Sequence, residues 1–280
     1  MDIFGDNNVS LLLFSIAPAL FYSFIIFSRV PHGILKIRPI LIYIFVGLLS
    51  ITILGFIQFA FPHLQQIMDF DIIGINEVSP GSFKPVIRPS LFGIFIHAFF
   101  QIALLEELSK LIVFKSADYI RGKAKVLLDR PFAVMFYSGM ISIGFAFIEN
   151  ISYVARAVWG DFGEMGITPE VILIERSASA VILHMLAGMF MGYFIAIGRM
   201  FAKPLKRFSF MILGLISAMF IHGAYDFVLM TPNGPGDILR ITDSISFHIP
   251  SMIIILFGTL TAFVMASHLL RLRYKDKKLR

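Results

Sequence analysis

The residues of this chain that are best able to do chemistry are a few ionisable groups inside otherwise apolar stretches. They are Glu106, Glu107, Lys110, Glu149, Glu175, Arg176, His184, His222 and Asp226. A charged side chain at the centre of a membrane helix costs at least about 2.5 kcal/mol on insertion scales, so such groups are rare and typical of functional sites. Carboxylates and imidazoles together can activate a water molecule, relay protons or bind a metal ion.

Helical spacing brings several of these groups together. Lys110 follows Glu106 by four residues and Glu107 by three, so it can pair with either acid and leaves the other without a basic partner. His222 and Asp226 are also four residues apart, which lets the carboxylate orient the imidazole. For each of these groups, the alternative to a functional role is a purely structural hydrogen bond or ion pair within or between helices. This alternative has the most weight for His184.

Two histidines and a glutamate form a ligand set that zinc accepts, and a remaining Glu or Asp can serve as a base for water. His184, His222 and Glu149 are the candidate ligands. The chain has no cysteine, which excludes thiolate ligands, a cysteine nucleophile and disulfides. Glu175 and Arg176 lie near the outer end of their stretch, where pairing with each other or with lipid headgroups explains them equally well.

The composition predicts that these groups are held by membrane helices. Of 280 residues, 58% are hydrophobic and 15% charged, and the mean hydropathy is +0.84, which leaves too little polar surface for a soluble globule. Apolar stretches recur that are long enough to cross about 30 Å of hydrocarbon. We expect an all-α polytopic membrane protein with about seven spans, at 9–28, 39–61, 91–114, 131–157, 171–198, 208–230 and 248–270.

The net charge of +6 is concentrated in alternate connections between spans, which argues against a nucleic-acid-binding surface. The other connections contain only Lys84, Arg88 and Arg240 as basic residues. The positive-inside rule therefore predicts an N-terminus outside and a cytoplasmic C-terminus. Segment 62–90, which is rich in proline, is then expected to be an irregular extracytoplasmic loop.

Four motifs on successive spans resemble the PrsW family of intramembrane proteases, which shares a superfamily with the CAAX-processing and bacteriocin-processing proteases. The motifs are Glu106-Glu107-Leu108-Ser109-Lys110 (EExxK), Phe145-Ala146-Phe147-Ile148-Glu149-Asn150 (FxxxEN), His184 with Gly188, and His222-Gly223-Ala224-Tyr225-Asp226 (HxxxD). Each motif alone is weakly specific, but the combination of all four inside apolar helices is much more specific. The resemblance covers about residues 91–230, expected to be a four-helix catalytic core within a single membrane domain of residues 1–280.

The resemblance implies hydrolysis of a peptide bond in or near a bacterial or archaeal cytoplasmic membrane, with anti-sigma factors as the substrate class. Glu106 would activate water or bind a metal, and either it or Glu107 would do the chemistry. The remaining residues implied for the site are Glu149, His184, His222 and Asp226, supported by Lys110, Asn150 and Arg176. Zinc is the implied cofactor, and a metal-free site in which Glu and His activate water stays an alternative.

Two other functions remain open. Buried Glu, His and Asp also build proton relays in ion- or proton-coupled transporters, although the sequence shows neither clear inverted repeats nor broken helices. A non-catalytic membrane scaffold with the same fold is the third possibility. Other intramembrane proteases are disfavoured, because the chain lacks HExxH and GxSG motifs and has only one intramembrane aspartate.

Overall fold

The computed structural model describes most of the apolar stretches of the chain. The described residues are 17–18, 21–22, 24, 37–60, 75–77, 86–88, 90–122, 131–159, 168–231, 238–240 and 246–278. The helices are α3 (Ile37–Ala60), α5 (Leu91–Ile96), η1 (His97–Ala103), α6 (Leu104–Gly122), α7 (Pro131–Trp159), α8 (Pro169–Ala178), α9 (Ala180–Arg199), α10 (Pro204–Met230) and α11 (Ile249–Lys278). The strands are β1 (Ile75–Glu77), β2 (Val86–Arg88), β3 (Ile238–Arg240) and β4 (Ser246–His248).

Among the described residues, six helical segments are long and apolar enough to cross a membrane. They are α3, the α5–η1–α6 segment, α7, the α8–α9 segment, α10 and α11. They match the last six predicted spans to within a few residues and confirm the all-α polytopic membrane fold. The first predicted span, 9–28, lies almost entirely outside the described residues.

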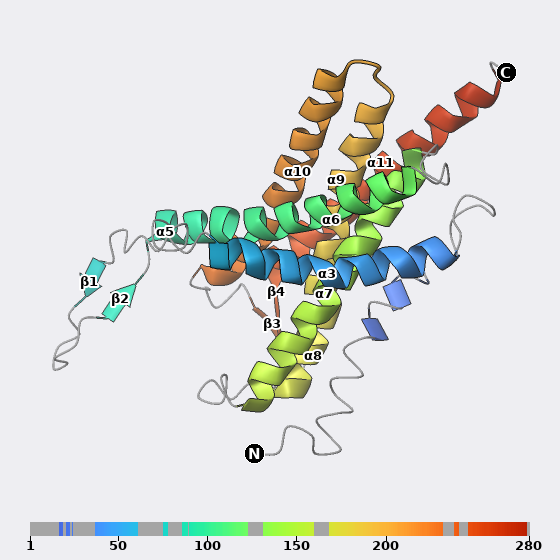
Figure 1. Cartoon of the computed structure of the whole chain (residues 1–280). Coiled ribbons are helices and arrows are strands. Elements are labelled where there is room, and N and C mark those ends of the chain that lie inside the picture. Colours follow the sequence, from blue (N-terminus) through green and yellow to red (C-terminus); the bar gives the residue numbers. More distant parts are fainter. Residues whose placement is uncertain are drawn as a thin grey trace.

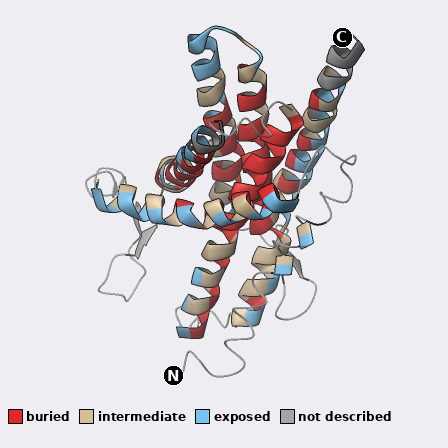
Figure 2. Ribbon diagram, turned by 45° about the vertical axis from the view of Figure 1, so that its right-hand side comes forward, coloured by how far each residue is buried: buried red, intermediate tan, exposed pale blue. Residues whose placement is uncertain are grey.

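The helices pack around α7 and α9, which contact each other along much of their length. α10 packs against α9, α3 against α7, and α11 against both α9 and α10. In Figure 1, α3 and α6 run across the direction of α9 and α10 rather than alongside them. Buried residues are concentrated where these helices cross, as the red segments of Figure 2 show. Large apolar side chains cover the outer faces of α3 and α11, as expected for helices in lipid.

Small residues hold α7 and α9 at short distance. A Cβ added to Gly188 of α9 would lie only 2.7 Å from the backbone oxygen of Ser138 in α7. A Cβ added to Gly192 would lie 2.7 Å from Cα of Met135. Close approach at small residues is the usual way in which membrane helices gain packing contacts. The two helices that carry Glu149 and His184 are therefore tightly packed against each other.

Two of the spans are irregular close to the polar groups. The third span contains the π-helix η1, in which the backbone N–H of Leu104 bonds to the carbonyl of Phe99. The fifth span is divided at Ser179, whose φ of −126° and ψ of −66° separate α8 from α9. No proline or glycine marks either position in the sequence. The span predicted at 171–198 therefore consists of two helices that meet at Ser179.

Short strands form two antiparallel pairs, β1 with β2 and β3 with β4. The first pair lies in segment 62–90, for which the sequence predicts an irregular or partly interfacial loop. The rest of the segment before Ser90 lies outside the described residues. Strand β4 leads directly into α11 and places His248 at the start of that helix.

Candidate active site

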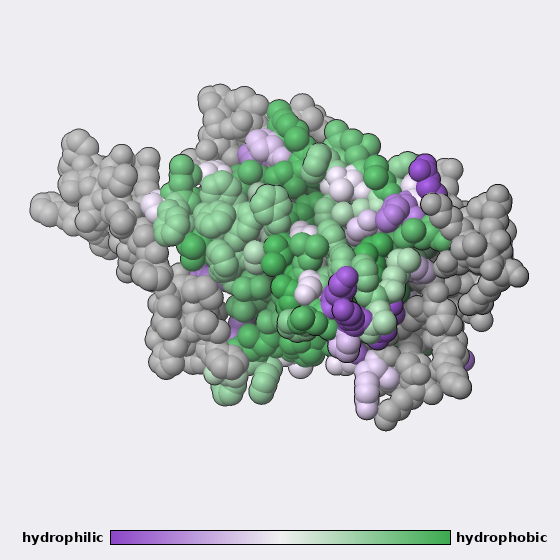
Figure 3. Space-filling view, turned by 90° about the horizontal axis from the view of Figure 1, so that it is seen from above, coloured by the Kyte–Doolittle hydropathy of each residue, from purple (hydrophilic) through white to green (hydrophobic). Residues whose placement is uncertain are grey.

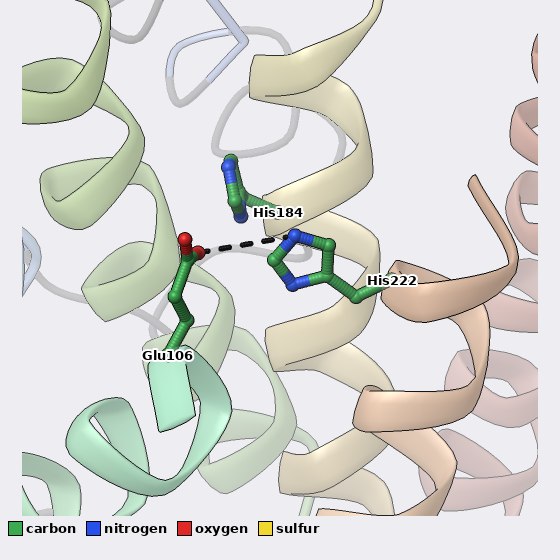
Figure 4. Close-up of side chains that lie close together, drawn as sticks. All are labelled: Glu106, His184 and His222. Atoms are coloured by element: carbon green, nitrogen blue, oxygen red, sulfur yellow. Dashed lines mark ion pairs between the residues drawn. The ribbon is translucent and has the colours of Figure 1, made fainter. Parts of the chain in front are cut away.

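Glu106, His184 and His222 come together from α6, α9 and α10. One ligand atom of each side chain lies within 4.8 Å of those of the other two, and Figure 4 shows the three side chains directed toward one another. Nε2 of His222 is 3.8 Å from Oε2 of Glu106. The two imidazole rings are nearly perpendicular, with centroids 4.7 Å apart. Residues far apart in the sequence thus form one buried cluster.

Glu107 lies behind this cluster, where its side chain is fully buried. Its Oε1 accepts a hydrogen bond from Nζ of Lys110 at 2.7 Å and lies 2.9 Å from Nδ1 of His222. Lys110 is farther from Glu106, with its Nζ 3.7 Å from Oε2. With Nδ1 bonded to Glu107, His222 directs Nε2 toward Glu106 and toward Asp226, whose Oδ2 is 3.3 Å away.

Lys110 also fixes the orientation of His184. Nζ of Lys110 lies 3.0 Å from Nδ1 of His184. Because a lysine ammonium has only donors, Nδ1 is the acceptor. The proton of the neutral imidazole is then on Nε2, which lies 2.7 Å from Oε2 of Glu149. A chain of polar contacts therefore runs from Glu107 through Lys110 and His184 to Glu149.

Glu149 has no charged partner in its own helix, and its partner comes from α8. A terminal nitrogen of Arg176 lies 2.8 Å from Oε2 of Glu149. Nε of Arg176 donates to Oδ1 of Asn150 at 2.9 Å, and its guanidinium lies 3.8 Å from the ring centre of Tyr153. Arg176 thus contacts both polar residues of the FxxxEN motif.

The cluster faces a cavity of about 480 Å³. Six of the predicted site residues line it: Glu106, Glu149, Arg176, His184, His222 and Asp226. Among the described residues, Oε2 of Glu106 and Oδ2 of Asp226 are buried without a hydrogen-bond partner. Buried polar atoms normally have partners, and a cavity of this size has room for water or an ion beside these oxygens.

Several polar residues of the cavity wall were not predicted from the sequence. The hydroxyl of Tyr225 donates to Oγ of Ser179 at 2.8 Å, and Ser179 in turn donates to the carbonyl of Glu175 at 2.7 Å. Tyr225 lies inside the HxxxD motif, three residues after His222, so its helical position was an available signal. His248 also lines the cavity, with a buried Nδ1 that has no partner among the described residues. No sequence pattern marks His248.

The donor set fits a divalent metal ion, which would replace the proton that His184 carries on Nε2. Two imidazoles and a carboxylate are ligands that zinc accepts, and one oxygen of Glu106 is buried without a partner among the described residues. Glu149, which is expected from the sequence to be a ligand together with the two histidines, forms ion pairs with His184 and Arg176. Its carboxylate still borders the same cavity.

A carboxylate–imidazole cluster that faces a cavity among apolar helices fits a hydrolase that acts within the membrane. The family model described as PrsW family intramembrane metalloprotease matches residues 40–261, and the chain belongs to this family. The match extends on both sides of residues 91–230, where the four motifs lie, to include most of α3 and part of α11.

Relatives in several bacteria carry the name Protease PrsW. The protein of Oceanobacillus iheyensis is 32% identical over 161 residues, which are 56% of this chain and 67% of the relative. The protein of Shouchella clausii is 27% identical over 221 residues, which are 79% of this chain and 84% of the relative. The protein of Bacillus subtilis is 28% identical over 138 residues, 49% of this chain and 56% of the relative. No solved structure matches the chain. The chain is thus a hydrolase, an intramembrane protease.

Proposed function

We propose that this protein hydrolyses a peptide bond of a membrane-anchored protein inside the cavity that Glu106, His184 and His222 border. The convergence of these three side chains from three helices is the observation that carries the proposal. The cavity of about 480 Å³ falls within the range of ordinary ligand pockets, about 300–1,000 Å³.

Glu106 is the proposed general base. Its Oε2 borders the cavity without a hydrogen-bond partner among the described residues. It would take a proton from water while the water oxygen attacks the carbonyl carbon of the substrate. The carbon–nitrogen bond then breaks, and the proton passes to the amine of the leaving fragment. Glu107 does not line the cavity, so we assign it the positioning of Lys110 and His222.

The other site residues are proposed to bind and orient. Arg176 borders the cavity as a cation and would stabilise the negative charge that develops on the substrate carbonyl oxygen. Asn150 holds Arg176 through Nε, and Glu149 holds both Arg176 and His184. Asp226 would support His222 at Nε2, opposite the Nδ1 that contacts Glu107.

Zinc is the proposed metal, with His184, His222 and Glu149 as the ligands, which leaves Glu106 as the base for the attacking water. When bound, it would supply Lewis acidity toward water and the substrate carbonyl. Metal analysis of the purified protein tests this part. We expect about one zinc per chain, lost together with activity on chelation and restored together by zinc. Full activity of a metal-free preparation would instead support the alternative in which Glu106, His222 and Arg176 act without a metal.

The proposed topology follows the charges of the connections. We assign the ends of α6, α9 and α11 to the cytoplasm, where basic residues gather, and segment 62–90 to the outside. The catalytic core is residues 91–230 within one membrane domain. The cytoplasmic membrane of a bacterium is the proposed location, and a single-span protein of the anti-sigma-factor type is the proposed substrate.

Reconstitution into liposomes with a single-span substrate tests the function. We expect two fragments whose new ends, identified by mass spectrometry, map within or next to the span. The same vesicles, assayed for uptake driven by a pH gradient, test the transporter alternative. Uptake without any fragment from a panel of single-span substrates would overturn the protease proposal, and absence of both activities would favour a scaffold.

A further inference from the structure

A second polar pocket lies near the turn between α9 and α10, away from the acid–imidazole cluster. Its volume is about 520 Å³, and its basic lining residues are Lys115, Arg199 and Arg207. Each of these cations belongs to a helix of the active-site cluster: Lys115 to α6 with Glu106, Arg199 to α9 with His184, and Arg207 to α10 with His222. The two sites are therefore connected by the same three helices.

The basic pocket has the charge of an anion-binding site. No Asp or Glu is among the described residues that line it. Residues 199–207 contain four basic residues and no acidic residue. Like charges around one pocket repel one another, and an anion between them removes that repulsion. A phosphate group accepts hydrogen bonds from several cations at once and suits such a pocket.

Local contacts hold two of the cations in place. Nε of Arg207 donates to the carbonyl of Phe201 at 2.7 Å, which leaves its terminal nitrogens for other acceptors. The guanidinium of Arg199 lies 5.9 Å from the ring centre of Phe114. Because a hydrogen bond already restrains Arg207, less side-chain entropy is lost when this residue binds an anion.

The other part of the pocket is apolar. Ile195, Phe208 and Met211 line it beside the cations. Phe208 and Leu205 are 55% and 75% exposed, as expected where a helix faces acyl chains. Figure 3, a view from above Figure 1, shows hydrophilic groups separated by a mostly apolar surface. A free phosphate ion would gain nothing from the apolar part, whereas a phospholipid uses both parts.

We propose that this pocket binds the headgroup of an anionic phospholipid, with the phosphate among Lys115, Arg199 and Arg207 and an acyl chain along Phe208. Such a lipid connects α6, α9 and α10 at one end. It thereby stabilises the mutual placement of the helices that carry Glu106, His184 and His222. The binding itself does not depend on the proposed function, so it is tested without an activity assay.

Lipid binding is measured on the full chain in a neutral detergent by native mass spectrometry and by thermal unfolding. We expect phosphatidylglycerol to bind and to raise the unfolding temperature, and phosphatidylcholine to do neither. One Lys or Arg contributes about 1 kcal/mol to the attraction of an anionic lipid surface, so Arg207→Gln and Arg199→Gln should each weaken binding about fivefold. Lys203→Gln is the matched control, because Lys203 lies in the same basic segment but does not line the pocket.

Three outcomes would overturn the proposal. If phosphatidylcholine bound as tightly as phosphatidylglycerol, the pocket would not discriminate between headgroups by their net charge. An equal loss in Lys203→Gln would mean that only the overall basic surface matters. Glycerol phosphate binding as tightly as the lipid would identify a soluble phosphate as the ligand. If Arg207→Gln does not fold, the comparison is made between Arg199→Gln, which removes a charge from the pocket, and Arg207→Lys, which keeps it.

Discussion

Nδ1 of His222 lies 2.9 Å from Oε1 of Glu107, although 115 residues separate them in the chain. The same carboxylate oxygen accepts a hydrogen bond from Lys110. One acid of the EExxK motif therefore connects α6 to α10 inside the protein, while its neighbour Glu106 borders the cavity. This contrast gives the two adjacent glutamates different expected roles in stability and in chemistry.

Replacement of Glu107 by Ala is expected to destabilise the fold. Lys110 is only 1% exposed and would lose its nearest carboxylate, and breaking a buried ion pair costs about 3–5 kcal/mol. Unfolding in a mild detergent, followed by circular dichroism, measures the loss. The matched control is Glu107→Leu with Lys110→Met, which removes both charges and should recover much of the stability. A Glu107→Ala protein as stable as the wild type would show that the pair carries no such energy.

Asp226→Asn tests the support that Asp226 gives to His222. The substitution keeps the size of the side chain and removes the charge 3.3 Å from Nε2 of His222. Asp226 lies beside Nε2, the nitrogen left for a metal because Glu107 contacts Nδ1, and loss of an outer carboxylate of a metal site typically costs about 10–100-fold in metal affinity. We therefore expect zinc affinity, measured by competition with a chelating dye, to fall by about that factor, and to fall further in His222→Gln. Unchanged affinity in both proteins would contradict the role given to His222.

Gly188→Ala tests the close packing of α7 against α9. The new methyl group would meet the Ser142 side chain and lie 2.7 Å from the backbone oxygen of Ser138. Overpacking of this kind costs about 1–3 kcal/mol. Gly55→Ala in α3 is the control, because an added Cβ there has no neighbour within 4 Å among the described residues, and it should be neutral or slightly stabilising. Equal unfolding midpoints for the two variants would contradict the packing described here.

Tyr225→Phe tests the hydrogen bond that reaches the break between α8 and α9. The phenol donates to Ser179 at 2.8 Å, and loss of one such bond costs about 0.5–1.5 kcal/mol. Ser179→Ala removes the acceptor, so the double variant should lose less stability than the sum of the two single variants. Simple additivity in thermal unfolding would mean that the two side chains do not interact.

The spans and the site residues were predictable from the sequence for different reasons. Apolar length alone predicts membrane helices, because the bilayer requires about 20 apolar residues per span. Glu106, Glu149, His184 and His222 were recognisable because ionisable groups are rare in such segments. Each of these signals is local, so neither depends on how the helices are arranged.

Contacts between helices were not predictable in the same way. Nothing in the spacing of residues 149 and 176 indicates that Glu149 pairs with Arg176. The division of the fifth span at Ser179 is likewise unmarked by proline or glycine, and the hydroxyl that contacts Ser179 there belongs to Tyr225 in another helix. The crossing of α6 over α9 and α10, which brings Glu106 to the two histidines, follows from packing of whole helices (Figure 1).

The most direct test of the proposed site is the cleavage rate of Glu106→Gln in liposomes that contain a single-span substrate. Loss of a general base lowers a rate by about 10²–10⁴-fold, and we predict a fall of that size with an unchanged unfolding temperature. Glu170→Gln, at the exposed start of α8, should cleave like the wild type. Cleavage by Glu106→Gln at the wild-type rate would contradict the assignment of this cluster as the hydrolytic site.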